Sequence, residues 1–250
     1  KNVNKIFKQA LKYNVNKIVI FDKEKYKKNI DKFKKKRINV YLTIKDALKK
    51  NKKKSFLTIN AISGIDGLEP SLNIIKYTKN FATANKESII CGWDLIKKAA
   101  LKNKTEIIPI DSEHFSILNL IKSHSFKEIK KIYITASGGP FLNYTKNRLK
   151  KIKPSDAIKH PKWKMGKKIS VDSATLMNKI FEIIEAQKLF NIPNSRLDIL
   201  IHPDSLVHAI IEFKNGLVKF MYHETSMIIP LANALFEGNI DIENFYKNKK

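Results

Sequence analysis

The sequence predicts an α/β protein in which a doubly wound parallel sheet is followed by an α+β domain. Residues 1 to about 110 alternate helical stretches with short apolar runs, which is typical of buried parallel strands in βαβ units. Beyond residue 130, the dipeptide Asn215-Gly216 between two apolar runs is a strong hairpin signal. The hydrophobic content of 43% is enough for a core. No apolar run reaches about 18 residues, so we expect no membrane span.

The first half should contain five strands, at 17–22, 38–43, 55–63, 81–84 and 106–111, and five helices, at 4–14, 23–37, 44–51, 67–78 and 87–101. Ligands of doubly wound sheets bind beyond the carboxyl ends of the strands. Three polar clusters fall there, at 63–67, 85–87 and 111–114. Each cluster alone reads as an ordinary loop with helix-capping residues, but the three together indicate a binding site.

The glycine-rich phosphate fingerprint of a dinucleotide fold, G-x-G-x-x-G after a first strand, is absent. Either the chain binds no dinucleotide, or that strand and its loop lie upstream of Lys1. The chain starts without Met and stops in KNKK, so we expect both ends to be cut from a longer protein. The single cysteine, Cys91, allows no intramolecular disulfide and fits a reducing compartment.

The second half is organised around a helix expected at 174–190, with Asp172 and Ser173 as N-cap residues. Ser173 would then sit where free N–H groups and the helix dipole favour an anion. Asn178 and Glu182 are four residues apart and should share one helix face. Further strands are expected at 131–137, 197–202, 209–213 and 217–222, and a closing helix at 228–238. Gly138-Gly139 would let backbone approach a ligand, or would form a plain turn.

The formal net charge of +26 invites a nucleic-acid-binding interpretation. Only three of the 49 basic residues are Arg, namely Arg37, Arg148 and Arg196. Nucleic-acid readers depend on Arg for bidentate contacts, and these lysines are scattered along helices. We therefore favour solvated lysine faces over a polyanion groove, although such a surface would still attract a small phosphorylated substrate.

The carboxylates Asp111, Glu113 and Glu182 are candidate ligands for Mg²⁺ or Mn²⁺, which prefer hard oxygen donors. Histidines occur at 160, 202 and 208, but their spacing matches no compact zinc pattern. No nucleophile-elbow G-x-S-x-G is present. Lys86 and Lys179 are open to two interpretations, as Schiff-base lysines or as phosphate contacts.

Several blocks closely resemble the 1-deoxy-D-xylulose 5-phosphate reductoisomerase family: ANKES (84–88), PIDSEH (109–114), SGGPF (137–141), HPKWKMGKKISVDSAT (160–175), MNK (177–179) with Glu182, and IHPDSLVH (201–208). The resemblance implies isomerisation and reduction of that sugar phosphate to 2-C-methyl-D-erythritol 4-phosphate. It implies NADPH and Mn²⁺ or Mg²⁺ as cofactors, with Co²⁺ possible. It also implies a homodimer with no nucleic-acid or membrane partner. We expect bacterial cytoplasm, with a plastid as the other home of this pathway.

The resemblance also assigns domains and residues. Residues 1–127 would form a Rossmann-like NADPH-binding domain without its first strand and glycine loop. Residues 128–250 would form the catalytic and dimerisation domain, with a flap near 160–166 and without the family's C-terminal helical domain. The implied metal ligands are Asp111, Glu113 and Glu182, and the implied substrate contacts are Lys86, Ser112, Glu113, Ser137, His160, Ser173, Asn178 and Lys179. The implied NADPH contacts are Lys1, Asn2, Asn85, Glu87 and Gly166, and the flap residues are His160, Trp163 and Met165.

The chain departs from the family at two places. Ile180 and Phe181 replace a usual Gly and small apolar pair, and HETSM (223–227) stands where a Pro-Asp-Met is usual. Two alternatives stay open beside the enzyme. One is a basic nucleic-acid-binding protein on a Rossmann-like scaffold, and the other is a non-catalytic homologue.

Overall fold

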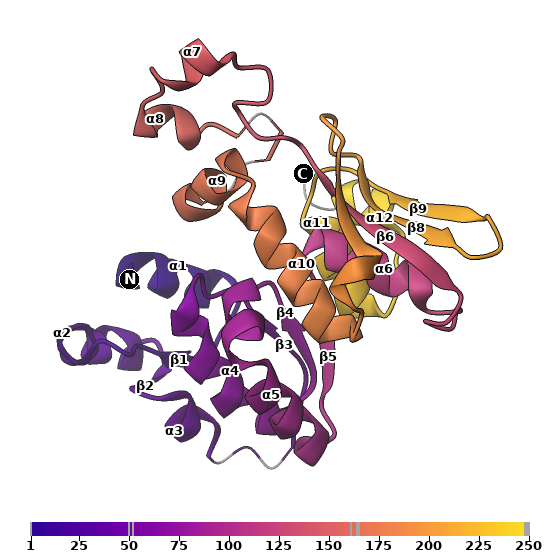
Figure 1. Cartoon of the computed structure of the whole chain (residues 1–250). Helices are drawn as coiled ribbons and strands as arrows, with labels where there is room; N and C mark the ends of the chain where they lie inside the picture. The colour runs from indigo at the N-terminus through magenta and orange to yellow at the C-terminus, as the bar shows by residue number, and fades with distance from the viewer. Residues whose placement is uncertain (1, 50, 52, 161, 164–165, 248–250) are drawn as a thin grey trace.

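The computed structural model describes residues 2–49, 51, 53–160, 162–163 and 166–247 (Figure 1). The helices of the first half are α1 (Val3–Lys12), α2 (Lys23–Lys34), α3 (Ile44–Leu48), α4 (Leu68–Ile74) and α5 (Lys86–Asn103). Its strands are β1 (Lys17–Val19), β2 (Asn39–Tyr41), β3 (Ser55–Asn60), β4 (Thr78–Thr83) and β5 (Glu106–Pro109). The predicted strands and helices of this half are confirmed, with ends shifted by a few residues.

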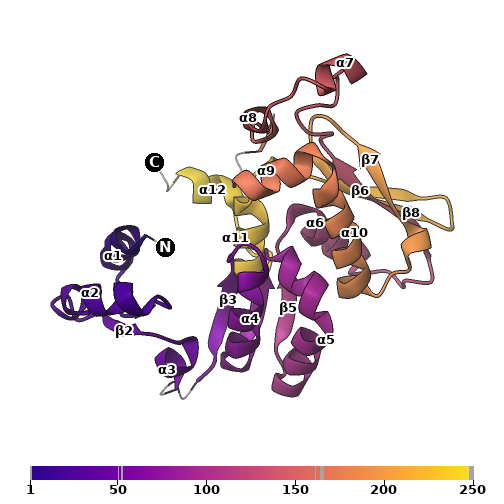
Figure 2. The ribbon, with the colours of Figure 1, turned by 60° about the vertical axis from the view of Figure 1, so that its left-hand side comes forward.

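All strand pairs of the first half are parallel, as predicted. They form two sheets, β1-β2 and β3-β4-β5, where one continuous sheet was expected. Figure 2 shows β2 with α1, α2 and α3 standing to one side of β3 and β5. The strands of a doubly wound sheet follow the order 3-2-1-4-5-6. Here β2 and β1 correspond to strands 3 and 2 of that order, and β3, β4 and β5 correspond to strands 4, 5 and 6. Among the described residues, no strand occupies the central position between them.

The helices of the second half are α6 (Ser112–Ile121), α7 (Lys146–Leu149), α8 (Pro154–Ala157), α9 (Lys167–Ala174), α10 (Met177–Phe190), α11 (Ile228–Phe236) and α12 (Ile242–Lys247). The strands are β6 (Ile129–Ala136), β7 (Leu197–Ile201), β8 (Val207–Phe213) and β9 (Val218–Tyr222). The sheet order is β7-β6-β8-β9, with β7 parallel to β6 and the other pairs antiparallel. The predicted hairpin is confirmed, because Gly216 adopts a φ of +87° between β8 and β9.

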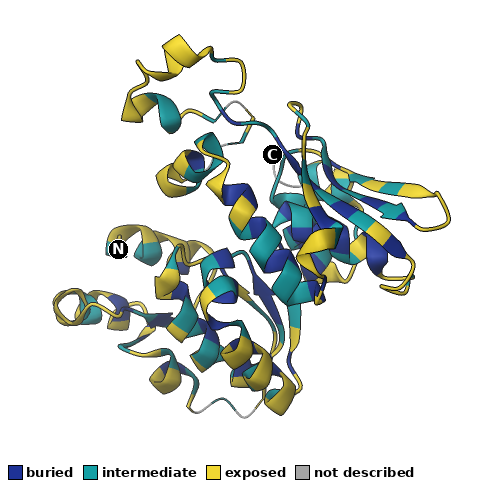
Figure 3. Ribbon diagram, in the orientation of Figure 1, coloured by how far each residue is buried: buried dark blue, intermediate teal, exposed yellow. Residues whose placement is uncertain are grey.

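Helices α6 and α10 pack on one face of this second sheet (Figure 1). Their shared core contains Ile117, Ile121, Ile132, Ile134, Ala186, Phe190 and Ile211. Figure 3 shows buried positions along the strands of both halves and exposed positions on the outer helices. The sequence analysis did not predict α6, and this helix lies before the expected boundary at 127/128 although it packs on the second sheet. No described helix is both long and apolar enough to cross a membrane.

The predicted start of the central helix is wrong. Asp172 and Ser173 lie in the last turn of α9, and α10 begins only after Leu176, whose φ is +58°. The side chain of Asp172 pairs with Lys168 Nζ at 2.7 Å and caps no helix. The helix-dipole argument for an anion at Ser173 therefore fails. The first turn of α10 instead presents Asn178 and Lys179.

Candidate active site

A cavity of about 280 Å³ lies where the carboxyl ends of β4, β5 and β6 meet α9 and α10. The predicted site residues that line it are Lys86, Asp111, Ser112, Glu113, Ser137, His160, Trp163, Gly166, Ser173, Asn178, Lys179 and Glu182. They come from segments nearly 100 residues apart in the chain. The structure thus brings the predicted metal and phosphate groups to one cavity.

Three carboxylates converge at the cavity wall. Asp111 precedes α6, Glu113 belongs to the first turn of that helix, and Glu182 projects from α10. One ligand oxygen of each lies within 4.8 Å of the other two. Asn178 donates from its amide nitrogen to Glu182 Oε1, which confirms that the two share a helix face. This all-oxygen donor set fits a hard divalent cation such as Mg²⁺ or Mn²⁺.

Two buried lysines interleave with these carboxylates. Lys86 Nζ lies 2.8 Å from Asp111 Oδ2, 3.1 Å from Glu182 Oε1 and 2.9 Å from Asn178 Oδ1. Lys179 Nζ bonds to Glu113 Oε1 and, at 2.7 Å, to Glu182 Oε2. Burial lowers the pKa of both lysines, but the carboxylates outweigh it and the net pKa is raised. Both amines therefore stay protonated in the metal-free fold, which favours phosphate contacts over a Schiff base, since that chemistry needs a neutral amine.

The carboxylates themselves titrate differently. Burial and the neighbouring charge of Glu113 raise the pKa of Glu182 to about 7. Burial also raises the pKa of Glu113, but the ammonium of Lys179 outweighs it and holds that pKa well below its usual range. If a metal binds here, it has to displace the proton of Glu182.

The raised pKa of Glu182 predicts pH-dependent metal binding. Below pH of about 7 a metal must displace its proton, so the Mn²⁺ association constant should fall about tenfold per pH unit and level off above it. In the metal-free protein, folding stability depends on pH in the opposite sense. The stabilisation that Glu182 contributes to the fold is complete below about pH 4.5 and is lost as pH rises through 7. Calorimetric Mn²⁺ titration at several pH values measures the first effect, and a flat profile would contradict the assignment.

The opposite wall carries hydroxyl groups. His160 Nδ1 accepts from the backbone N–H of Trp163 at 2.8 Å, so its proton lies on Nε2, which donates to Ser137 Oγ at 3.0 Å. Ser137 Oγ also accepts from the N–H of Gly139 at 3.1 Å. With two bonds accepted, the Ser137 hydroxyl proton is left for an acceptor in the cavity. Such a donor suits a phosphate oxygen.

The glycine pair after β6 is explained by close packing. Gly138 and Gly139 have φ values of +81° and +70°. A Cβ on Gly139 would lie 2.8 Å from the carbonyl oxygen of Ser173. The loop therefore presses against the end of α9 and places Ser173 at the cavity wall. The close approach that the structure shows is to α9, so the expected approach to a ligand stays a prediction.

The predicted NADPH contacts are dispersed. Asn2 caps α1, and its side chain accepts from Lys5 N–H at 3.0 Å. Asn85 caps α5, and its amide donates to the carbonyls of Ile62 and, at 2.8 Å, Gly64 in the loop after β3. Glu87 pairs with Lys168 at 2.8 Å. Of these contacts only Gly166 lines the cavity, while Lys1, like the flap residue Met165, lies outside the described residues.

Sequence reasoning gave no role to Ser205 and His208, which also line the cavity. The signal was the block 201–208, quoted above without a role for these two residues. The His208 ring stacks on His223 with centroids 3.7 Å apart, and its Nε2 donates to the His223 carbonyl at 3.0 Å. Burial and the His223 charge lower the pKa of His208 to about 4. The cavity wall thus carries a neutral imidazole at His208, chiefly because this ring is buried.

The other departure lies at the side of α10. Ile180 is exposed, and Phe181 is half-buried with Lys168 Nζ 5.3 Å from its ring centroid. Neither lines the cavity. The bulkier pair therefore leaves the carboxylates in place.

These features define a class of protein: a Rossmann-like α/β protein with a second, mixed sheet, in which three carboxylates and two buried lysines line a cavity between the two halves of the chain. Two family models match the chain, 1-deoxy-D-xylulose 5-phosphate reductoisomerase at residues 1–92 and the C-terminal domain of the same enzyme at residues 107–190. The chain belongs to the 1-deoxy-D-xylulose 5-phosphate reductoisomerase family. The resemblance seen in the sequence is confirmed.

Individual relatives agree. The chain is 48% identical over 254 residues to the reductoisomerase of Pelagibacter ubique, covering 97% of this chain and 65% of that protein. It is 50% identical over 180 residues to the reductoisomerase of Wolbachia pipientis, covering 72% of this chain and 46% of that one. The chain thus spans about half to two thirds of the length of these relatives.

Solved structures show the same fold. A reductoisomerase in complex with NADPH, fosmidomycin and magnesium superposes with a TM-score of 0.84 at 32% identity, over 93% of this chain and 60% of that one. The enzyme from Zymomonas mobilis in complex with NADPH gives a TM-score of 0.82 at 32% identity, over 94% and 61%. The predicted α/β class is confirmed, and the nucleic-acid-binding alternative is not favoured.

Proposed function

We propose that the protein converts 1-deoxy-D-xylulose 5-phosphate to 2-C-methyl-D-erythritol 4-phosphate, using NADPH and a divalent metal. One observation carries this proposal: the oxygen-ligand triad and the phosphate-binding side chains line the same 280 Å³ cavity. One solved relative is a complex with NADPH, fosmidomycin and magnesium, and another is a complex with NADPH. The relatives of this chain in Pelagibacter ubique and Wolbachia pipientis are bacterial enzymes, which supports the bacterial cytoplasm as the place of the reaction.

In this proposal Ser137, Ser173, Asn178 and Lys179 bind the phosphate end of the substrate. Ser137 offers its free hydroxyl proton, and Lys179 offers a buried positive charge at the first turn of α10. His160 orients Ser137 through Nε2, and Trp163 covers the cavity from the same loop. Closure of this loop, which includes Met165, would exclude water from the reacting atoms.

Asp111, Glu113 and Glu182 would hold the metal. When ionised they outnumber the ammonium groups of Lys86 and Lys179 by one charge, so a divalent ion changes the local charge from negative to positive. A positive site attracts a phosphorylated anion. When bound, the metal supplies a Lewis acid for the substrate carbonyl and NADPH supplies a hydride.

A second cavity, of about 1060 Å³, fits the nucleotide. It opens beyond the carboxyl ends of β1, β2 and β3, and Phe21, Thr43, Ser63 and Asp66 are among its lining residues. Dinucleotides bind at this edge of a doubly wound sheet. Asn85 fixes the β3 loop that lines this cavity. We assign residues 1–127 to NADPH binding on this basis, with Asn2, Glu87 and Gly166 as further contacts, and residues 128–250 to catalysis.

A homodimer is proposed through the uncovered face of the second sheet. Val218, Phe220 and Tyr222 alternate along the edge strand β9 and are 56%, 61% and 61% exposed. Exposed apolar patches of this kind mark interaction surfaces. Phe220→Lys should shift the protein from dimer to monomer in sedimentation analysis, whereas Lys214→Ala in the adjacent hairpin turn should not. A parent protein that sediments as a monomer would refute this proposal.

The function is tested by NADPH consumption with 1-deoxy-D-xylulose 5-phosphate. Turnover should require Mn²⁺ or Mg²⁺, stop on chelation and return when metal is added. The product should be 2-C-methyl-D-erythritol 4-phosphate. Metal and NADPH binding without any turnover would instead identify the non-catalytic homologue.

A further inference from the structure

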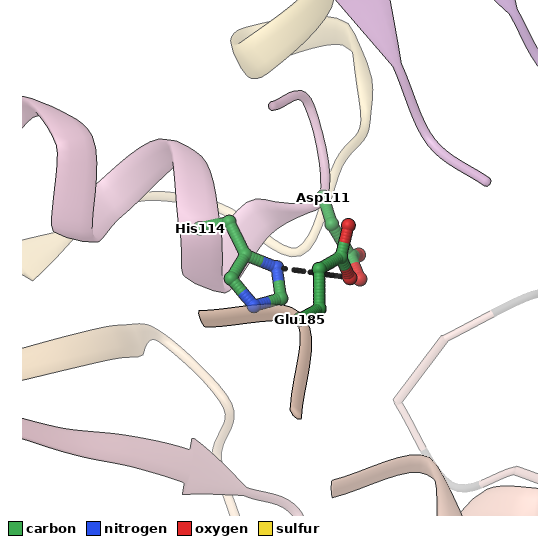
Figure 4. A group of neighbouring side chains, drawn as sticks. All are labelled: Asp111, His114 and Glu185. Carbon is green, nitrogen blue, oxygen red and sulfur yellow. Dashed lines mark ion pairs between the residues drawn. The ribbon is translucent and has the colours of Figure 1, made fainter. Parts of the chain in front are cut away.

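A second group of side chains, formed by Asp111, His114 and Glu185, shares Asp111 with the proposed metal triad (Figure 4). His114 of α6 and Glu185 of α10 are 0% and 1% exposed, and neither lines the cavity. His114 Nδ1 is 3.4 Å from Glu185 Oε2 and 3.9 Å from Asp111 Oδ2. Asp111 therefore belongs to both groups, facing the cavity ligands on one side and His114 on the other.

The other ring nitrogen of His114 contacts a second metal-ligand residue. His114 Nε2 lies 2.9 Å from the backbone carbonyl oxygen of Glu182. A carbonyl oxygen only accepts, so Nε2 must carry the proton and donate. One rigid ring thus spans from the end of β5, where Asp111 lies, to the turn of α10 that carries Glu182.

Glu185 has no other evident purpose in the fold. Both of its carboxylate oxygens are buried, and among the described residues they have no hydrogen-bond partner. Its one ion pair among the described residues is with His114. The Phe190 ring packs on the same imidazole, with centroids 6.3 Å apart. An apolar residue would fill this space at lower cost, since burying an unbonded carboxyl group is unfavourable.

We propose that His114 and Glu185 are positioning residues for the metal centre. Glu185 and Phe190 fix the imidazole, and the imidazole holds Asp111 and the Glu182 turn at the spacing that the metal needs. This inference rests on the proposed metal-dependent function. Residues behind a metal ligand commonly change metal affinity 10- to 100-fold when removed.

Asp111, His114 and Glu185 could also hold a second ion, because one ligand atom of each lies within 4.8 Å of the other two. Two features oppose that interpretation. Neither His114 nor Glu185 reaches the cavity, so water could not complete the coordination shell that Mg²⁺ or Mn²⁺ needs. In addition, the carboxylates of Asp111, Glu113 and Glu182 carry only one more charge than the two lysine ammonium groups. A single divalent ion already exceeds this excess negative charge. The number of ions bound per chain decides between the two interpretations.

The test compares two replacements of Glu185 by Mn²⁺ titration, which gives the affinity and the number of ions per chain. Glu185→Leu should weaken Mn²⁺ binding about 10- to 100-fold. Glu185→Gln should stay within about threefold, because its amide has the same shape and can donate to His114 Nδ1. His114→Gln, which keeps a donor for the Glu182 carbonyl but loses the contact to Asp111, should fall between them. If Glu185→Leu does not fold, the Mn²⁺ affinity of His114→Gln decides whether the proposal holds.

The matched control is Thr105→Val, which removes a buried hydroxyl whose one proton lies between the carbonyl oxygens of Ile75 and Thr78, each 2.9 Å away and outside the site. It should lower the melting temperature but leave Mn²⁺ affinity unchanged. Equal Mn²⁺ affinity in all Glu185 and His114 variants would overturn the proposal. The proposal would also be overturned if the parent chain bound two Mn²⁺ ions and both Glu185 variants bound one. Absent turnover with intact Mn²⁺ binding would refute the proposed function alone.

Discussion

Glu182→Gln should abolish Mn²⁺ binding and reduce metal-dependent turnover at least about 1000-fold. Glu182 is 1% exposed, shares the cavity wall with Asp111 and Glu113, and contacts Lys86, Asn178 and Lys179. Glutamine keeps the shape but loses the anionic oxygen that a hard cation prefers. Loss of a Lewis acid is worth several kcal/mol of transition-state stabilisation. Turnover and Mn²⁺ affinity should be measured on the same preparations.

The matched control for this variant is Glu212→Gln. Glu212 lies on the second sheet and pairs with Lys130 at 2.7 Å, away from the cavity. Glu212→Gln should leave turnover and Mn²⁺ affinity unchanged. Circular dichroism should show that Glu182→Gln and Glu212→Gln are both folded. Normal turnover in folded Glu182→Gln would remove this carboxylate from the metal site.

Lys179→Met should raise the KM for the phosphorylated substrate about 100-fold. The side chain lies at the first turn of α10, is 8% exposed and stays protonated. A hydrogen bond from a charged donor contributes about 1.5–3 kcal/mol, which corresponds to roughly 10- to 150-fold in affinity. Lys179 also bonds to Glu113 and Glu182, so turnover must be measured at saturating Mn²⁺.

Lys188→Met, nine residues further along α10 and outside the cavity, is the charge-matched control. Its KM and kcat should equal those of the parent protein. An unchanged KM in Lys179→Met would mean that this ammonium serves only the carboxylates. The phosphate assignment would then rest on Ser137, Ser173 and Asn178 alone.

Local patterns predicted much of this structure. Apolar runs such as 17–22 and 106–111 correctly predicted strands with parallel neighbours. Asn215-Gly216 gave the hairpin because a tight turn needs a positive φ. The spacing of Asn178 and Glu182 gave a shared helix face, since helix geometry alone decides it. The family blocks then identified most of the side chains that meet in the cavity.

The remaining features depend on tertiary contacts. Leu176 breaks the helix with a positive φ that no glycine or proline signals in the sequence. Ser173 does reach the cavity, but through Gly139 packing on α9 and not through a helix N-terminus. The polar cluster at 111–114 was interpreted as a loop with capping residues or as part of a binding site, and the helix that follows it, whose apolar face packs on the second sheet, was not predicted. His114 and Glu185 come together only when α6 and α10 pack.

The central claim is that the carboxylate triad and the phosphate-binding side chains form one site. The most direct measurement is the Mn²⁺ dissociation constant of the protein with and without 1-deoxy-D-xylulose 5-phosphate. We expect one ion per chain, bound at least about tenfold more tightly with the substrate present, and by linkage the same gain in substrate affinity with metal. Mn²⁺ affinity that is unchanged by a bound substrate would contradict the account, because metal and substrate would then occupy separate sites.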